Sequence, residues 1–260
     1  MSRISSLSTR LTLAILLPLS VLLLVSAIYE TFRDQKTMIE MAETGAANLA
    51  GSVVEELQGL MRSSKTAIDG LAIPISQLAQ ISAVAADAAL ATAIEQFPLI
   101  YGSALALDRG ANVTLPPFAR YAFRDGEKVI TSSLEDDEYR YWEQSWFSDT
   151  LSLNEPNWTD PYLDEGGGDV RMVTYARPVS IGNRRAVMTA DLRLTFINVI
   201  AAGNILGKAG AVLVFDASGE RVMHPRDQWI LQRSLADVAE EHSVPALAQV
   251  PAAIGRGERV

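Results

Sequence analysis

The stretch Asp169–Leu194, DVRMVTYARPVSIGNRRAVMTADLRL, determines what kind of domain this chain builds. Its first half alternates two sets of side chains, with Thr174 in one set and Tyr175 and the flanking arginines in the other. A period of two residues is typical of a β-strand, because successive side chains of a strand point to opposite faces of the sheet. The second half, from Arg185, is a further strand, and Gly182-Asn183 supplies a tight turn between the two. We therefore predict an antiparallel hairpin.

Three more short strands precede this hairpin. Residues 100–107, IYGSALAL, are apolar and end at a turn-forming Asp-Arg-Gly sequence. Residues 120–123 and 128–131 flank Asp125-Gly126, which is a strong hairpin signal. Antiparallel strands that follow a long helical region predict an α+β fold.

The helical region lies upstream, over residues 30–98. From residue 30 to about residue 72, apolar side chains recur mostly in steps of three or four, which is the spacing of one helix face. This stripe predicts either the seam of a homodimer or a face that packs on the following domain, and both alternatives stay open. We expect Pro74 to end or kink this helix, and a second, alanine-rich helix to occupy residues 77–96 before Phe97-Pro98.

A membrane segment precedes the helical stalk. Leu11–Tyr29, LTLAILLPLSVLLLVSAIY, holds 19 residues without a charge, and at about 1.5 Å per residue such a helix crosses a hydrocarbon layer of roughly 30 Å. The apolar run is too long for a typical signal peptide, and Val25-Ser26-Ala27 is a poor cleavage site. We favour an uncleaved anchor. The alternative is a secreted or periplasmic binding protein released by cleavage after Ala27.

A second sheet unit is expected near the end of the chain. Residues 211–216, AVLVFD, and residues 220–223 flank Ser218-Gly219, which predicts another hairpin. A helix over residues 194–202 would separate it from the first sheet. We expect this second unit to be only begun before Val260.

Composition excludes several classes of function. The chain carries 22 Lys+Arg against 31 Asp+Glu, for a formal charge of -9, which disfavours nucleic acid as a partner. It has no cysteine, which excludes disulfides, thiolate metal sites and a cysteine nucleophile. Its two histidines leave little for a metal cage or a Ser-His-Asp triad.

Two local patterns imitate binding motifs. Residues 203–209, GNILGKA, have three residues between the glycines where a phosphate-binding loop has four, and they end in alanine. The loop DEGGGD at 164–169 could hold calcium, but its spacing does not fit an EF-hand and a solvated turn is favoured. We expect no metal and no cofactor. An enzyme is disfavoured; the one catalytic alternative left open is a hydrolase with Asp164 and Asp191 as paired carboxylates.

Aromatic residues concentrate between Tyr139 and Tyr175, where eight of the chain's 18 rings fall within 37 residues. Several of them must form core. Mixed with acidic and amide side chains, they are also typical of a pocket for a small polar ligand, in which rings cover apolar or cationic parts and polar groups fix the orientation.

The order of several motifs resembles the double Cache sensor domains of bacterial transmembrane receptors. The motifs are WTDPYLD at 158–164, YARP at 175–178, ADL at 190–192, DASG at 216–219 and HP at 224–225. The resemblance covers about residues 30–245 and implies an extracytoplasmic ligand sensor, in which a long helix carries two PAS-like sheet modules and the membrane-distal module binds the ligand. The DEGGG loop is most similar to the sensors of serine/threonine phosphatases that regulate sigma factors; chemoreceptors and histidine kinases carry similar modules.

The resemblance also suggests site residues. Tyr139, Trp146, Tyr162, Asp164 and Asp191 match the positions by which relatives bind amino acids. The match breaks where Gln144 replaces an arginine and Phe147 replaces a ring with a hydroxyl. Because glutamine cannot supply the charged fork that grips a carboxylate, an amine or amino-acid-like metabolite is the expected ligand. The full candidate set comprises Tyr139, Trp142, Gln144, Trp146, Phe147, Tyr162, Asp164, Tyr175 and Asp191.

These expectations combine into one prediction. The chain is a single-pass protein of the cell inner membrane with its bulk extracytoplasmic, and it signals through an effector, such as a phosphatase or histidine kinase, that is absent from this chain. Its expected partners are a small ligand, the membrane and a second copy through the long helix. The expected layout is a cytoplasmic tail at 1–10, a transmembrane helix at 11–29, a helical stalk and second helix at 30–98, a membrane-distal module at 99–202 and the start of a membrane-proximal module at 203–260.

Overall fold

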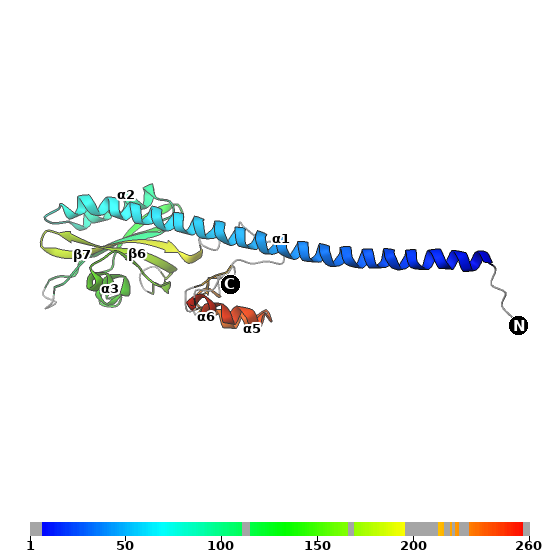
Figure 1. Ribbon diagram of the computed structural model, residues 1–260. Coiled ribbons are helices and arrows are strands. Elements are labelled where there is room, and N and C mark those ends of the chain that lie inside the picture. The colour runs from blue at the N-terminus through cyan, green and yellow to red at the C-terminus, as the bar shows by residue number, and fades with distance from the viewer. Residues whose placement is uncertain are drawn as a thin grey trace. The chain divides into compact units, whose positions relative to one another are not determined.

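The computed structural model describes residues 7–110, 115–165, 169–195, 213–215, 219, 222–223 and 229–256. The chain divides into two compact units, residues 1–52 and 53–260. Helix α1, Leu7–Ser76, begins in the first unit and ends in the second (Figure 1).

The first unit contains the candidate membrane span. Among the residues that the structure describes, α1 is the one helix long and apolar enough to cross a membrane, with a mean hydropathy of 2.0 over its most apolar window. Its large apolar side chains are exposed, for example Leu22 at 67% and Leu24 at 62%. Exposed apolar side chains over this length fit contact with lipid, since lipid tails are as apolar as the side chains themselves.

The second unit contains one antiparallel sheet with strand order β3-β2-β1-β7-β6-β4, in which β5 also pairs with β6. The mixed helix and antiparallel-sheet fold is confirmed, and so are the strands expected from the sequence. Their bounds are β1 Gly102–Leu107, β2 Ala119–Asp125, β3 Lys128–Ser133, β4 Asn157–Trp158, β5 Tyr162–Leu163, β6 Arg171–Ile181 and β7 Arg184–Arg193.

The β6–β7 hairpin forms as the sequence predicts, with Ile181 opposite Arg184. Gly182 in its turn has a φ of 57°, and a Cβ there would lie 2.3 Å from the carbonyl oxygen of Ala79. Its N–H also donates to the carbonyl of Leu78 at 2.9 Å. Only glycine meets both demands, because it has no side chain to clash and it tolerates positive φ.

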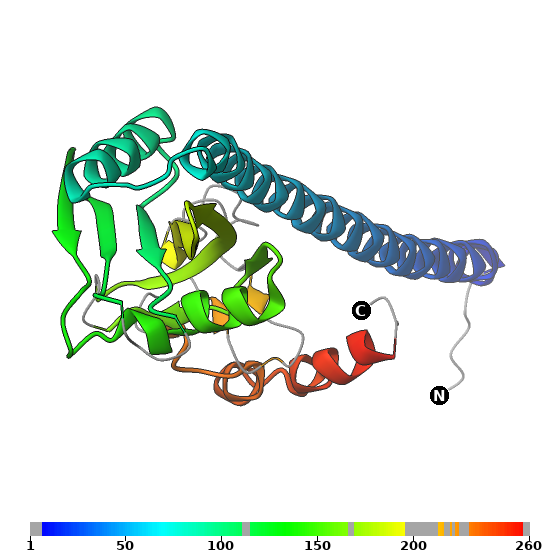
Figure 2. The same ribbon diagram turned by 90° about the vertical axis from the view of Figure 1, so that its left-hand side faces the viewer.

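One face of the sheet is covered by the end of α1 and by α2, Ala83–Gln96, while α3, Ser145–Leu153, lies on the opposite face (Figures 1 and 2). Ile68 of α1 and Leu90 of α2 are fully buried against strand residues such as Leu105. Burial of this apolar surface holds the helices to the sheet.

The opposite face has its own core. The 3₁₀ turn η1, Tyr141–Glu143, precedes α3, and Tyr141, Trp146 and Phe147 pack there in edge-to-face contacts. Ala176 of β6 and Val187 of β7 close this core from the sheet. The strands thus carry a different cluster on each face, as the period of two residues requires.

Two helix boundaries differ from those expected. Helix α1 continues two residues past Pro74, because a proline in the last turn removes only one backbone donor there. The second helix begins at Ala83 rather than residue 77, because the Ser82 side chain accepts a hydrogen bond from the N–H of Ala85 and caps the helix.

The apolar stripe on α1 has two kinds of surroundings. Leu71 packs against the sheet core and Leu57 against Leu194 and Ile230, so this part of the stripe is a packing face. Met38 remains exposed at 65%. The dimer seam stays a prediction.

The C-terminal part holds a smaller group of elements. The expected hairpin is confirmed as β8, Val214–Phe215, paired with β9, Val222–Met223. It is followed by α5, Leu235–Glu241, η4, Pro245–Gln249, and α6, Val250–Gly255. The helix expected at 194–202 falls mostly outside the described residues. Residues 203–209, the motif at 224–225 and the three glycines of the acidic loop lie entirely outside the described residues.

Candidate functional site

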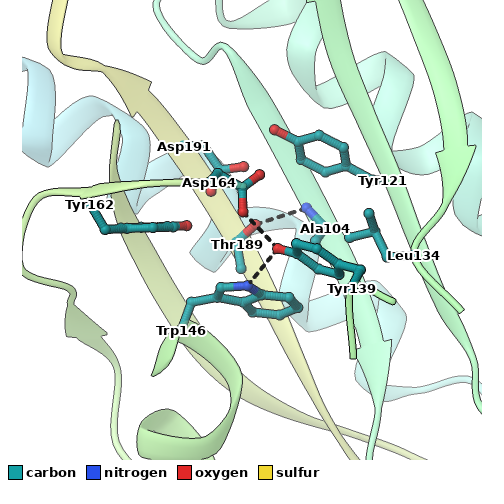
Figure 3. A pocket seen from close by; sticks show the side chains of 9 residues that line it. All are labelled: Ala104, Tyr121, Leu134, Tyr139, Trp146, Tyr162, Asp164, Thr189 and Asp191. Atoms are coloured by element: carbon teal, nitrogen blue, oxygen red, sulfur yellow. Dashed lines mark hydrogen bonds between the residues drawn. The ribbon is translucent and has the colours of Figure 1, made fainter. Parts of the chain in front are cut away.

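A small enclosed pocket lies on the sheet face that carries α3 (Figure 3). It is lined by Ala104, Tyr121, Leu134, Tyr139, Trp146, Tyr162, Asp164, Thr189 and Asp191. Figure 3 shows the carboxylates of Asp164 and Asp191 beside each other, with tyrosine hydroxyls pointing toward them.

The two central strands place Asp191. It lies on β7 opposite Thr174 of β6, so their side chains share a face. Thr174 Oγ1 donates to Asp191 Oδ1 at 2.9 Å, and the Tyr162 hydroxyl lies 2.9 Å from Thr174 Oγ1. Thr189, two residues before Asp191, accepts a hydrogen bond from the N–H of Ala104 at 2.8 Å. Asp191 is 4% exposed and thus held inside the sheet face.

Asp164 reaches the pocket from the loop that follows β5. Its carbonyl accepts from the N–H of Asp169 at 2.8 Å and its N–H donates to the carbonyl of Val170, which ties Asp164 to the residues before β6. The Tyr139 hydroxyl donates to Asp164 Oδ1 at 2.7 Å, and Trp146 Nε1 donates to the same hydroxyl at 3.2 Å. A chain of donors therefore ends on this carboxylate.

Burial changes the acidity of both carboxyl groups. Burial, together with the nearby charge of Asp164, raises the pKa of Asp191 to about 7, against the hydrogen bonds from Thr174, Tyr121 and Thr189. Burial also raises the pKa of Asp164 to about 6, against the hydrogen bond from Tyr139. No lysine or arginine lines the pocket among the described residues. The site therefore holds two acids in a low-dielectric place without a counter-charge, which is an environment that favours a cation.

The tyrosines act as neutral donors in this setting. Burial raises the pKa of Tyr139 and of Tyr162 well above their ordinary values, and the neighbouring carboxylates add to the effect. The buried hydroxyl of Tyr121 points toward the two carboxylates (Figure 3), and its hydrogen bonding to Asp191 lowers the pKa of that carboxyl. It is a further neutral donor at the site.

The space between these side chains is small. It amounts to about 10 Å³, which is room for about one water-sized sphere. A second hollow of about 430 Å³ is lined by Asp136, Glu138, Tyr139 and Glu165. Tyr139 belongs to both linings, so the acidic hollow adjoins the pocket at this residue. A ligand larger than water needs the lining side chains to move.

The candidate residues divide between the pocket and its surroundings. Tyr139, Trp146, Tyr162, Asp164 and Asp191 line it.

The other four lie elsewhere. Trp142 and Phe147 pack edge-on against Tyr141. Gln144 Nε2 donates to the backbone carbonyl of Tyr139 at 2.8 Å, which makes it a support for that residue. Tyr175 lies in the core on the opposite face of the sheet.

Four lining residues were not expected from the sequence: Ala104, Tyr121, Leu134 and Thr189. For Thr189 a signal existed, since it precedes Asp191 by two residues on the same strand and therefore shares its face. Tyr121 comes from β2, which does not pair with β7, and only the strand order brings it near Asp191.

A polar network on the other face joins β6 to α1. The Tyr175 hydroxyl donates to Asp69 Oδ1 at 3.0 Å and accepts from Lys65 Nζ at 3.1 Å, and Arg177 donates to Asp69 as well. Burial raises the pKa of Asp69, but the hydrogen bonds from Lys65 and Arg177 outweigh it and lower the pKa below its ordinary value. Because Tyr175 follows Thr174, adjacent residues of β6 contact the pocket on one face and α1 on the other.

Comparisons with known proteins agree with this geometry. Residues 87–199 match the model of the family described as methyl-accepting chemotaxis protein-like, first PDC sensor domain. No curated protein matches the chain. The matched region contains the whole pocket, and the matched family is one of sensor domains rather than catalytic domains.

Solved structures share the fold. The extracellular domain of a protein named as a histidine kinase is 24% identical, with 76% of each chain covered and a TM-score of 0.59. The ligand-binding domain of the Pseudomonas aeruginosa amino acid chemoreceptor PctC, in complex with GABA, is 15% identical over 74% of this chain and 78% of that one, with a TM-score of 0.53. That of the Campylobacter jejuni chemoreceptor Tlp3, in complex with L-valine, is 16% identical over 71% and 69%, with a TM-score of 0.52. The sheet unit therefore has the fold of extracellular sensor domains.

Proposed function

We propose that the chain is a membrane-anchored extracytoplasmic sensor whose sheet module binds a small ligand carrying an ammonium group. The observation that carries this proposal is the pair of buried carboxylates, Asp164 and Asp191, in an aromatic pocket with no basic residue among its described lining. An ammonium group between them would offset the burial and the repulsion from Asp164 that raise the pKa of Asp191. Surrounding rings would favour the same cation through their negative faces.

An amine is favoured over an α-amino acid because the pocket offers little to a carboxylate. The Gln144 side chain is neutral and its amide already donates to a backbone carbonyl. The bound molecules of the two chemoreceptor structures, GABA and L-valine, both carry an amino group, which supports the amine half of the ligand.

The effect of ligand binding would be transmitted from the pocket through β6 to α1. Binding at Asp191 acts on Thr174, and the next residue, Tyr175, is hydrogen-bonded to Asp69 and Lys65 of α1. The apolar segment of α1 places its start in the membrane in this proposal, with the bulk of the chain outside the inner membrane. A homodimer through α1 and an effector of the phosphatase or histidine kinase type complete it.

Calorimetric titration of the full chain in lipid nanodiscs tests the ligand class. Propylamine and butylamine should give saturable heats, whereas propanol and butanol, which lack the ammonium group, should not. Asp191→Asn should abolish amine binding. Asp149→Asn, which removes an exposed carboxylate of α3, should leave it unchanged. Equal binding of propanol and propylamine, or amine binding that survives Asp191→Asn, would remove the assignment.

The anchor has a separate test. The membrane fraction of expressing cells is collected and the N-terminus of the chain is sequenced. A chain that begins at Met1 or the residue after it supports the anchor. One that begins after Ala27 and is found in the soluble fraction replaces the anchored sensor by a released binding protein.

A further inference from the structure

A separate cavity lies at the start of β1, distinct from both the acidic pocket and the hollow beside Tyr139. Its volume is about 330 Å³, and its lining consists of Pro98, Leu99, Tyr101, Arg124, Gly126, Arg193 and Thr195. It shares no lining residue with the acidic pocket. Among the described residues two arginines and no acid line it, so its charge is opposite to that of the acidic pocket.

The strand register brings the two arginines to one place. The N–H of Arg124 donates to the carbonyl of Tyr101, since β2 pairs with β1 on one side. The N–H of Tyr101 donates to the carbonyl of Asp191 on the other side, where β7 runs on to Arg193. Arg124 and Arg193 therefore flank the start of β1 from both neighbouring strands.

Each guanidinium is held in place by a contact that leaves its charge unpaired. Arg124 donates through Nε to the carbonyl of Ile100 at 3.1 Å and through Nη2 to that of Ile94, near the end of α2. Arg193 lies over the ring of Tyr101, with its guanidinium carbon 3.8 Å from the ring centre. These contacts fix both groups without using all their donors, because a guanidinium has five N–H groups.

Neither arginine has an acidic partner. Both are half-buried, neither forms an ion pair with a described residue, and the Nε of Arg193 is buried without a hydrogen-bond acceptor. The residues that follow Thr195 cannot supply one nearby in sequence, since positions 196–215 contain no Asp or Glu. In a chain with 31 acids and 22 bases, these two arginines keep their charge available to an anion, because burying a charge costs less when it is paired.

We propose that this cavity binds a small organic anion, a carboxylate with a short apolar body. The two guanidinium groups suit the oxygens of a carboxylate, which accept two parallel N–H bonds. The ring of Tyr101 and the side chains of Pro98 and Leu99 form an apolar wall for the rest of the molecule. The site is independent of the amine site and does not rest on the function proposed above.

Titration of benzoate into the full chain in nanodiscs tests the proposal, with empty nanodiscs as the blank. Benzoate should bind saturably, and benzamide, which has the same ring and no charge, should not. Arg193→Gln should weaken benzoate binding roughly ten- to hundredfold, because a charge-assisted pair is lost. Arg62→Gln, which removes an exposed arginine of α1 and changes the net charge equally, should leave the affinity unchanged. Asp191→Asn should also leave it unchanged, although that change abolishes amine binding.

A second variant keeps the test decisive if Arg193→Gln fails to fold. Leu99→Asp leaves both arginines in place and adds a carboxylate to the cavity lining, where Leu99 is 37% exposed, and it should abolish benzoate binding. Inorganic phosphate is titrated in the same way, and its affinity is compared with that of benzoate. Benzamide binding as well as benzoate, benzoate binding that survives both variants, or phosphate binding more tightly than benzoate would each overturn the proposal.

Discussion

Replacing Asp191 by asparagine should stabilise the ligand-free protein at neutral pH and remove its affinity for amines. Burial and the charge of Asp164 raise the pKa of Asp191 from 3.8 to about 7. A difference of about 3 pKa units corresponds to about 4 kcal/mol. Asparagine has no charge to bury, so the wild-type protein carries this cost above neutral pH and the variant does not.

The net gain should be smaller, about 2 kcal/mol. The asparagine oxygen can still accept the hydrogen bond from Thr174, but its amide brings two donors into a buried place, and each costs free energy when it finds no acceptor. For a chain of this size, about 2 kcal/mol corresponds to a rise in Tm of roughly 4–8 °C.

The pH dependence distinguishes this cause from ordinary repacking. Below about pH 3 Asp191 is protonated in both the folded and the unfolded state, so ionisation costs nothing there. As the pH rises toward 7, the unfolded chain releases the proton while the folded protein retains it, and the wild type loses stability. The charge-dependent difference in Tm between the variant and the wild type should therefore be absent below about pH 3 and full above pH 7.

Thermal unfolding followed by tryptophan fluorescence in nanodiscs measures this difference, since Trp146 lies in the pocket. Asp149→Asn, which removes an exposed carboxylate, is the matched control and should show no such dependence. A variant that lowers Tm equally at pH 5 and pH 8 would refute the reasoning, because it would show that Asp191 stabilises the fold through contacts that do not depend on its charge.

Three further predictions concern other contacts. Tyr121→Phe removes a buried hydroxyl that favours the ionised form of Asp191, so the Tm of the ligand-free protein should fall at neutral pH and calorimetry should show weaker amine binding; an unchanged Tm would contradict the contact with Asp191. The Asp87 carboxylate accepts two hydrogen bonds from Arg120, both at 2.8 Å, and this pair ties α2 to β2. Asp87→Asn breaks the pair, and chemical denaturation should show that the free energy of unfolding falls by about 1–3 kcal/mol. Gly182→Ala should destabilise the protein by more than about 1 kcal/mol, because position 182 has a positive φ and a Cβ there would clash. Gly70→Ala on α1 meets open space and should stabilise the helix slightly. Equal effects of the two substitutions would contradict the backbone argument.

The strands were predictable because each carries its own local signal. The alternation around Thr174 and Tyr175 predicts two faces, and the structure puts those residues on opposite faces of β6. The turn at Gly182 was equally predictable, since a glycine between two strands is a strong local signal. The first residues of the helices were harder to predict. Ser82 fixes the start of α2, and a cap of one residue is easily missed when the preceding residues are also good helix formers.

The site was predictable only in part. Asp164 and Asp191 stand 27 positions apart in sequence, and the resemblance of their motifs, rather than any local pattern, suggested that both face one ligand. Tyr175 belonged to the same aromatic stretch as Tyr139, but composition does not say which face of a strand a ring occupies. The structure places it beside Asp69 of α1, where it serves a different contact.

By itself the sequence determined the elements of this protein: an apolar helix at the N-terminus, a long helical stalk and antiparallel strands with turns at glycine. These follow from the spacing of side chains over a few residues. Only the tertiary structure decided which residues meet. Strand order brought Tyr121 to Asp191 and set Arg124 beside Arg193, and burial then raised the pKa of the acids. Contacts between distant segments, and the desolvation that they cause, depend on how the strands pair, and no local pattern contains that information.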